Sequence, residues 1–400
     1  MSAEPSEQVD WDAVGRRVGT ALDWVFAGLR GVVMAALALV RGTVRLTSGS
    51  IRWVRDHREE SAAVARRARG PALSAASVAA GAAAGGVAER ALLRSTPAAP
   101  FEADPTPYGQ PALIHGPDGR LLVHRHGSVD QPTVVLVHGW SNTHVVWHKQ
   151  VQRLRDRFHV VTYDQPGHGT SDPPREWSVH ALGRALRAVI ESTGADRVTV
   201  VGHSLGGAAI LDLLGEDPGF FIEHVTGVVF VGSAASFTDR DIAAGPLARL
   251  ERRVHLGGRL IRLRGLGPIA ALSRRSSDIS HLAFRLVAFG RRPDAADVDL
   301  TEQLWTDADP EMVSGLARAL DRWNGRAAAR ELPANTAVIH GPRDLVLPVW
   351  LGRELADLAG IGDVTVVPGR GHQLHLEAPE EVSETIARIA TKGAADGARG

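Results

Sequence analysis

The chain has 400 residues with 45 basic and 45 acidic side chains, so its formal net charge is zero. This balance gives no electrostatic reason to expect nucleic-acid binding, because nucleic-acid-binding domains usually carry an excess of positive charge. The absence of cysteine excludes disulfide bonds, cysteine nucleophiles and thiolate metal sites. The length exceeds one ordinary domain, which favours one α/β domain of about 250 residues plus an extension.

The first 95 residues are rich in alanine, glycine and arginine, unlike the rest of the chain. Their strongly apolar run GVVMAALALV, residues 31–40, is too short to cross a bilayer unaided. On a continuous helix, several arginines would gather near one face beside an apolar stripe. These arginines are Arg30, Arg41, Arg45, Arg52 and Arg55. Two interpretations stay open: residues 16–95 lie on an anionic membrane surface, or the helix packs on a partner or on the catalytic domain.

A second uncharged run at 70–88 consists mostly of alanine, glycine and serine, and its hydropathy is marginal for membrane insertion. The acidic start MSAEPSEQVDWD lacks the positive segment of a secretory signal, which favours a cytoplasmic or peripherally membrane-associated protein. Residues 1–95 are predicted to be a helical extension and the proline-containing residues 96–111 a linker. Residues 112–392 are predicted to be the catalytic domain, and residues 393–400 a disordered tail.

After the linker, short apolar strands alternate with helical patterns. A hairpin is expected at 113–127, and the apolar strands that follow are 133–139, 158–164, 197–204, 225–232, 336–341 and 363–369. Continuous apolar runs of this length, linked by helices, indicate a parallel sheet covered on both faces, which is an α/β fold. Ligands of such sheets gather at the carboxyl ends of the strands.

The stretch VTVVGHSLGGAAI, residues 198–210, changes from a strand pattern to small residues and then to an alanine-rich helical pattern. This order predicts a strand, a sharp turn and a helix, with Ser204 at the apex of the turn. Gly202 and Gly206 remove Cβ atoms where the strand and the helix approach, so that the serine can adopt a strained backbone. The pattern is GxSxG, the nucleophile elbow. An ordinary glycine-rich loop is the alternative, and the surrounding motifs decide between the two.

Other chemically competent residues follow the predicted strands. VLVHGWSNTHVVW places His138, Gly139 and Trp140 after one strand, HGPRDLVLP places Asp344 after another, and PGRGHQLHLEAPEEV places His372 after the last. With YDQPGHGTSD and GHSLGG, these motifs resemble the α/β-hydrolase family over residues 111–392. The resemblance implies an eight-stranded, mostly parallel sheet flanked by helices, with a helical cap inserted after the sixth strand at about 233–330.

The chemistry of that family needs a nucleophile, a base, an acid and two oxyanion donors. His372 is expected to take the proton of Ser204 during attack, while Asp344 orients the imidazole. The backbone N–H groups of Leu205 and Trp140 are expected to form the oxyanion hole. The supporting residues around them are His138, Gly139, Gly202, His203 and Gly206.

Some assignments have competitors. His375 could be mistaken for the base, Asp344 could instead cap the following turn, and His203 is expected to pack under the elbow. Asp164, His168 and Asp172 are expected to shape a loop beside the site without a chemical role. The stretch HVVWH at 144–148 lacks the glutamate of a zinc protease, so no metal is predicted.

The prediction for function is a serine hydrolase that acts without a cofactor on a small-molecule carboxylic ester with an apolar part. Neither a phosphate-loop lysine nor the dinucleotide glycine pattern is present, and serine at the elbow speaks against epoxide hydrolases and haloalkane dehalogenases. Apolar cap residues could line an acyl pocket or form the core of the cap. These are Leu282, Phe284, Leu286, Val287 and Phe289. The same serine site would also suit a thioesterase, an amidase, a carbon–carbon bond hydrolase or a perhydrolase. A non-catalytic membrane-docked binding protein is the alternative from another class.

Overall fold

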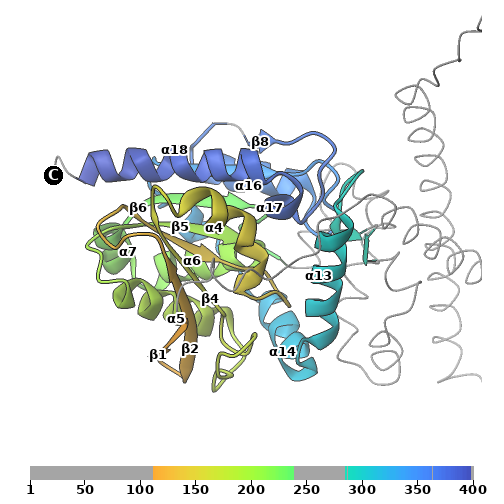
Figure 1. The fold of residues 1–400 in the computed structure, drawn as a ribbon, viewed down its shortest axis with the longest axis horizontal. Coiled ribbons are helices and arrows are strands. Elements are labelled where there is room, and N and C mark those ends of the chain that lie inside the picture. Colours follow the sequence, from red (N-terminus) through yellow and green to blue (C-terminus); the bar gives the residue numbers. More distant parts are fainter. Residues whose placement is uncertain (1–110, 238–283, 286, 363, 398–400) are drawn as a thin grey trace, which may run out of the picture. The chain divides into compact units, whose positions relative to one another are not determined.

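The computed structural model describes residues 111–237, 284–285, 287–362 and 364–397 (Figure 1). The predicted extension at 1–95 and the linker up to residue 110 lie outside these residues, so their helical structure stays a prediction. The described residues form one eight-stranded sheet in the order β1-β2-β4-β3-β5-β6-β7-β8. The strands are β1 Pro111–His115, β2 Arg120–His126, β3 Thr133–Val137, β4 His159–Tyr163, β5 Val198–His203, β6 Val225–Val231, β7 Thr336–His340 and β8 Thr365–Val366.

The sheet is mostly parallel, as predicted. Strand β1 pairs antiparallel with β2 and β2 antiparallel with β4, while every other neighbouring pair is parallel. The parallel strands from β3 to β7 are rich in β-branched residues, and nearly every residue in them is buried. Such strands need cover on both faces, since they have no polar side to turn to water.

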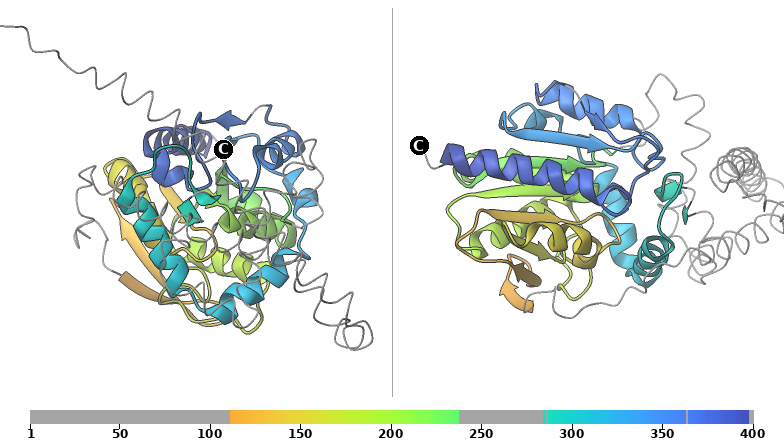
Figure 2. Two further views of the ribbon diagram at one scale, coloured as in Figure 1. Left: turned by 90° about the vertical axis from the view of Figure 1, so that its right-hand side faces the viewer. Right: turned by 45° about the horizontal axis from the view of Figure 1, so that its top comes forward.

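Helices provide that cover. On one face, α5, α6 and α16 pack on Val135, Val200 and Val338; on the other, α4 and α18 pack on Leu136 and Val201. Helix α18 runs along its face of the sheet in dark blue (Figure 2). The helices are η1 His144–Trp147, α4 His148–Leu154, α5 Val179–Ser192, α6 Leu205–Glu216, α7 Pro218–His224, α13 Ala295–Asp307, α14 Pro310–Leu320, α15 Arg326–Ala329, α16 Val349–Leu358, α17 Leu374–Glu377 and α18 Pro379–Gly397.

The chain between β6 and β7 is a long insertion whose described part contains α13, α14 and α15. Helices α13 and α14 lie beyond one end of the strands, apart from the helices that flank the two faces (Figure 1). The cap predicted at about 233–330 stays a prediction, because residues 238–283 lie outside the described part of the chain. Among the described residues, no helix combines the length and the apolar character needed to span a bilayer.

Two predicted boundaries differ from the structure. Helix α18 continues to Gly397, so the predicted disordered tail at 393–400 is helical through that residue. The apolar residues Ile386, Ile389 and Ala390 are buried against the sheet, and this packing supports the helix that continues beyond them. Strand β1 begins at Pro111, the residue at which the predicted linker ends.

Candidate active site

Ser204 follows β5 directly and caps the N-terminus of α6, as the GxSxG pattern predicts. Its backbone has φ 51° and ψ −115°, a strained conformation for a residue with a side chain. A Cβ atom on Gly202 would lie 2.6 Å from the backbone carbon of Gly206, and one on Gly206 would lie 2.3 Å from the carbonyl oxygen of Val137. Both glycines are therefore required by close backbone approach, which is the reason expected from the sequence.

The elbow is also fixed by its neighbour β6. The N–H of Ser204 donates to the Val231 carbonyl at 3.1 Å, and the Ser233 hydroxyl donates to the Ser204 carbonyl at 2.8 Å. This role of Ser233 was not predicted from the sequence, because a serine in GSAAS gives no sign of a long-range contact. The backbone of Ser204 is thus held on both sides, and its hydroxyl is left for chemistry.

His372 and Asp344 form a buried pair. The Nδ1 atom of His372 donates to the Oδ2 atom of Asp344 at 2.7 Å, while the Oδ1 atom accepts the N–H groups of Val346 and Leu347 at 2.9 and 2.7 Å. Burial alone would raise the pKa of the Asp344 carboxyl. The charge of His372 and hydrogen bonds from His340 and His372 outweigh burial and hold that pKa well below its usual range. Asp344 therefore stays ionised, and it both caps the turn and orients the histidine.

The histidine loop meets the elbow at the end of β6. A Cβ atom on Gly232, which has φ 52°, would lie 3.3 Å from the His372 carbonyl oxygen and 3.5 Å from the Asp344 Oδ2 atom. The rings of His203 and His372 have centroids 4.9 Å apart. Since Nδ1 of His372 is occupied by Asp344, its Nε2 is the nitrogen left to act as a base.

His203 does more than pack under the elbow. Its Nε2 atom donates to the His372 carbonyl at 3.0 Å. Burial, followed by the charge of His372, lowers the pKa of His203 to about 3, so the ring is neutral. Through this bond His203, which directly precedes Ser204, is joined to the main chain of His372.

The HGW loop lies against Ser204. A Cβ atom on Gly139 would lie 2.7 Å from the His203 ring and 3.3 Å from the Cβ atom of Ser204. The following residues turn sharply: the N–H of Asn142 donates to the Gly139 carbonyl at 3.2 Å, and the backbone between them includes a positive φ of 58°. Trp140 lies inside this turn. Leu205 is the first residue of α6, where a backbone N–H has no acceptor within the helix.

Two buried histidines brace the HGW loop. His138 donates from Nδ1 to the Gly139 carbonyl at 2.8 Å and accepts the N–H of Gln165 at Nε2 at 2.9 Å. His168 accepts the N–H of Ser141 at Nε2 at 3.3 Å and has a backbone carbonyl 3.1 Å from Nδ1. Burial lowers the pKa of His138 to about 3 and that of His168 to about 4, so both rings are neutral. His168 therefore shapes the loop beside the site, as expected.

The other expected loop residues also make structural contacts. Asp164 accepts the backbone N–H and the ring Nδ1 of His144, each at 2.8 Å. Burial opposes the ionised form of Asp164, but the bonds and charge of His144 outweigh it and lower the pKa to about 2. Asp172 pairs with Arg120 at 3.0 Å.

His375 is the alternative candidate for the base. It is His372, however, that bonds to Asp344. The ring of His375 packs 4.3 Å from that of His203 and 4.8 Å from that of Trp147, centroid to centroid. Burial lowers the pKa of His375 well below its usual value. These contacts make it a packing residue under the site. In the described part of the chain, no group of three or more metal-ligating side chains is arranged to hold a metal ion.

The chain belongs to the α/β-hydrolase fold family. The sequence pattern of that family, described as "alpha/beta hydrolase fold", matches residues 132–379, which is more than half of the chain. The matched residues include the elbow, the HGW loop, Asp344 and His372.

Individual relatives share shorter stretches. The chain is 37% identical over 107 residues to "Probable oxidoreductase EphD" of Mycobacterium tuberculosis, covering 26% of this chain and 18% of that protein. It is 32% identical over 109 residues to "Epoxide hydrolase 1" of Caenorhabditis elegans, covering 24% of this chain and 27% of that protein. A solved esterase from Exiguobacterium antarcticum matches with a TM-score of 0.60 at 21% identity, covering 70% of this chain and 100% of that one. The structural match shows the shared fold.

Proposed function

We propose that this protein is a serine hydrolase that cleaves carboxylic esters with an apolar part through an acyl-enzyme on Ser204. The observation that carries the proposal is the 2.7 Å bond between His372 Nδ1 and an ionised, buried Asp344, in a loop that meets the strained serine elbow. Such a pair fixes the tautomer of the histidine and leaves Nε2 free to accept a proton.

The reaction proceeds in two steps. The Ser204 oxygen attacks the ester carbonyl carbon and its proton passes to Nε2 of His372, which returns that proton to the leaving alcohol as the ester C–O bond breaks. Water then attacks the acyl-enzyme, gives a proton to His372, and releases the acid while the proton returns to Ser204. Asp344 stabilises the imidazolium in both steps. The backbone N–H groups of Leu205 and Trp140 donate to the oxyanion.

An aromatic cluster supports a substrate with an apolar part. The Trp140 ring meets that of Trp305 on α13, with centroids 6.0 Å apart, and Phe284 lies 6.2 Å from Trp305. Because Trp140 belongs to the loop proposed to supply an oxyanion donor, we assign this cluster to the apolar part of the substrate. Aromatic side chains favour apolar ligands.

Other reactions of the same fold compete with ester cleavage. A relative is named an epoxide hydrolase, but serine stands at the elbow where that branch carries aspartate. Thioesters, amides, carbon–carbon bonds and peracid formation use the same serine site. Ester cleavage needs the same triad and oxyanion donors as these reactions, so a panel of substrates has to separate them.

A fluorophosphonate probe tests the proposal on the purified full chain. The wild type should be labelled at Ser204, and Ser204→Ala should not be labelled. A folded wild type that resists labelling would favour the non-catalytic binding protein. A panel of p-nitrophenyl esters of increasing chain length, beside thioesters and amides, then identifies the bond that is cleaved.

We further propose that residues 16–95 attach this enzyme to an anionic membrane surface. The proposal rests on the arginine spacing beside apolar segments of the sequence. Attachment of this kind is electrostatic in part, so it depends on salt.

A further inference from the structure

A buried carboxylate joins the histidine loop to the insertion. Glu377 lies in α17, only 6% exposed, and its two oxygens accept different backbone N–H groups. The Oε1 atom accepts the N–H of Gly371 at 2.8 Å, and the Oε2 atom accepts that of Gly290 at 2.7 Å. Gly371 immediately precedes His372, whereas Gly290 belongs to the insertion between β6 and β7. One side chain therefore holds two segments that are distant in sequence.

The two segments also bond to each other through their backbones. The N–H groups of His372 and Gln373 both donate to the Ala288 carbonyl, at 2.9 and 3.0 Å. The N–H of Arg291 donates to the Gly369 carbonyl at 2.9 Å. The contact is close, since a Cβ atom on Gly371 would lie 2.5 Å from the backbone of residue 289. The insertion thus supplies the acceptor for the main-chain N–H of the base.

The carbonyl of His372 is held from the other side by the ring of His203, at 3.0 Å. Its side chain is held by Asp344. All the polar groups of His372 except Nε2 are consequently engaged. The position of Nε2 then depends on how firmly its loop is fixed, and small displacements of a reacting group cost large factors in rate.

We propose that Glu377 is a positioning residue for His372: it clamps the loop of the base to residues 288–291 of the insertion. This inference rests on the proposed function, in which His372 is the general base. Glu377 does not touch the reacting atoms and acts through the main chain of the loop.

The charge of Glu377 is compatible with this role. Burial raises its pKa to about 7, opposed by the two N–H bonds and by the charges of Arg285 and Arg370. The Arg285 guanidinium donates to the carbonyls of Gly290 and Arg291 at 2.7 and 3.0 Å, so it supports the same insertion segment. An ionised carboxylate accepts both N–H bonds more strongly than a carboxylic acid does.

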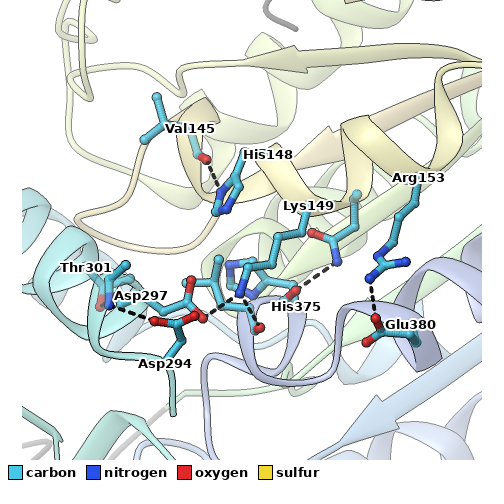
Figure 3. A network of polar contacts seen from close by, with 12 residues as sticks. Val145, His148, Lys149, Arg153, Asp294, Asp297, Thr301, His375 and Glu380 are labelled. Atoms are coloured by element: carbon cyan, nitrogen blue, oxygen red, sulfur yellow. Dashed lines mark hydrogen bonds and ion pairs between the residues drawn. The ribbon is translucent and has the colours of Figure 1, made fainter. Parts of the chain in front are cut away.

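A second tie between the insertion and α17 offers a matched control. Lys149 on α4 donates to Asp297 on α13 at 2.6 Å and to the Leu376 carbonyl at 3.1 Å (Figure 3). Asp297 is as buried as Glu377, being 3% exposed. However, Asp297 pairs with Lys149, which bonds to the Leu376 carbonyl in α17 and not to the loop at 369–373. Asp297 therefore joins the insertion to the core, as Glu377 does, but it does not hold the loop that contains His372.

The experiment compares Glu377→Gln with Asp297→Asn in the full chain, measuring the rate constant of fluorophosphonate labelling and the Tm. The amide in Glu377→Gln can accept one N–H but opposes the other with its own donor. We expect that variant to be labelled at least about tenfold more slowly, and Asp297→Asn to stay within about threefold of the wild type. On a cleaved ester, Glu377→Gln should lower kcat and leave KM nearly unchanged.

Two outcomes overturn the inference. One is labelling of Glu377→Gln at the wild-type rate; the other is a loss of rate that follows the loss of Tm equally in both variants. If Glu377→Gln does not fold, Glu377→Asp replaces it, because it keeps both oxygens but shortens their reach. A wild type that is not labelled at Ser204 would remove the proposed function first, whereas a labelled wild type with an unaffected Glu377 variant removes only this inference.

Discussion

The backbone of Ser204 and the backbone of His372 are held by different parts of the molecule. The serine is fixed by its own strand and helix and by the neighbouring strands, through Gly206 against Val137 and the bond to Val231. The histidine is fixed from outside the sheet, by the insertion at Ala288 and by Glu377. The proposed nucleophile therefore depends on the core, while the proposed base also depends on the insertion. This difference predicts which substitutions affect stability and rate together.

The largest effect on activity is expected at Asp344, whose Oδ2 atom accepts from His372 while its Oδ1 atom caps the following turn. Asp344→Asn should keep the fold, since the amide oxygen can still accept from the turn, but should lower kcat by about 10⁴-fold through the wrong histidine tautomer. Ester turnover and near-ultraviolet circular dichroism measure the two properties. Near-wild-type turnover would place the acid elsewhere.

On the serine side, Gly206→Ala should destabilise the protein. Its Cβ would lie 2.3 Å from the Val137 carbonyl oxygen, which belongs to the sheet and cannot move cheaply. We expect a loss of about 3 kcal/mol in the free energy of unfolding, with activity falling in parallel. Urea unfolding measures it.

Gly215→Ala on the same helix is the control. Its Cβ would meet only the Ala328 side chain at 3.4 Å, an ordinary contact. Alanine is the better helix former, so this variant should be as stable as the wild type or slightly more stable. Equal losses in both glycine variants would contradict the close-approach explanation of the elbow.

On the histidine side, stability should depend on pH through Glu377. Folding raises its pKa from the usual 4.5 to about 7, mainly by burial, so its protonated form favours the folded state. That stabilisation is complete below the pKa of the unfolded chain and is lost as the pH rises through about 7. Between pH 4.5 and 7.5 the free energy of unfolding of the wild type should fall by about 2 to 3 kcal/mol relative to Glu377→Gln. Parallel curves for the two proteins would show that the carboxyl titrates normally.

The smallest effect on activity is expected from removing the extension. A chain that begins at Phe101 should keep its ester turnover within about twofold but lose salt-sensitive sedimentation with anionic vesicles, because each cation near such a surface contributes about 1 kcal/mol. Unfolding or inactivity of the shortened chain would instead make the extension part of the hydrolase domain. If the full chain also stays in the supernatant and self-associates, its apolar helices form an oligomer contact.

Much of the fold was predictable because its strands have a clear sequence signal, a continuous run of apolar and β-branched residues. The β-branched runs predicted at 133–139 and 197–204 ended within two residues of β3 and β5, since buried parallel strands need continuous apolar sequence. The elbow was equally readable, because its glycines are adjacent to Ser204 and their purpose is local. The end of helix α18 was predicted too early, because residues 393–397 are small or polar and have no helical signal of their own.

The support of His372 could not be read in the same way. Ala288 contributes a carbonyl oxygen, which every residue possesses, so no pattern marks it. Glu377 stands in HLEAPEEV among other acidic residues, and only the folded chain distinguishes the one that turns inward. Gly232 was overlooked for a related reason: its neighbours His372 and Asp344 are far away in sequence.

The bonds of Ala288 to the histidine loop and of Gly290 to Glu377 bear on protein engineering. Insertions of this kind are attractive units to exchange when the selectivity of a hydrolase is to be altered. In this protein, a chimera that replaces the whole segment between β6 and β7 would also replace part of the scaffold under its base. A graft that keeps residues 288–291 native and exchanges the rest of the insertion would separate selectivity from the support of His372.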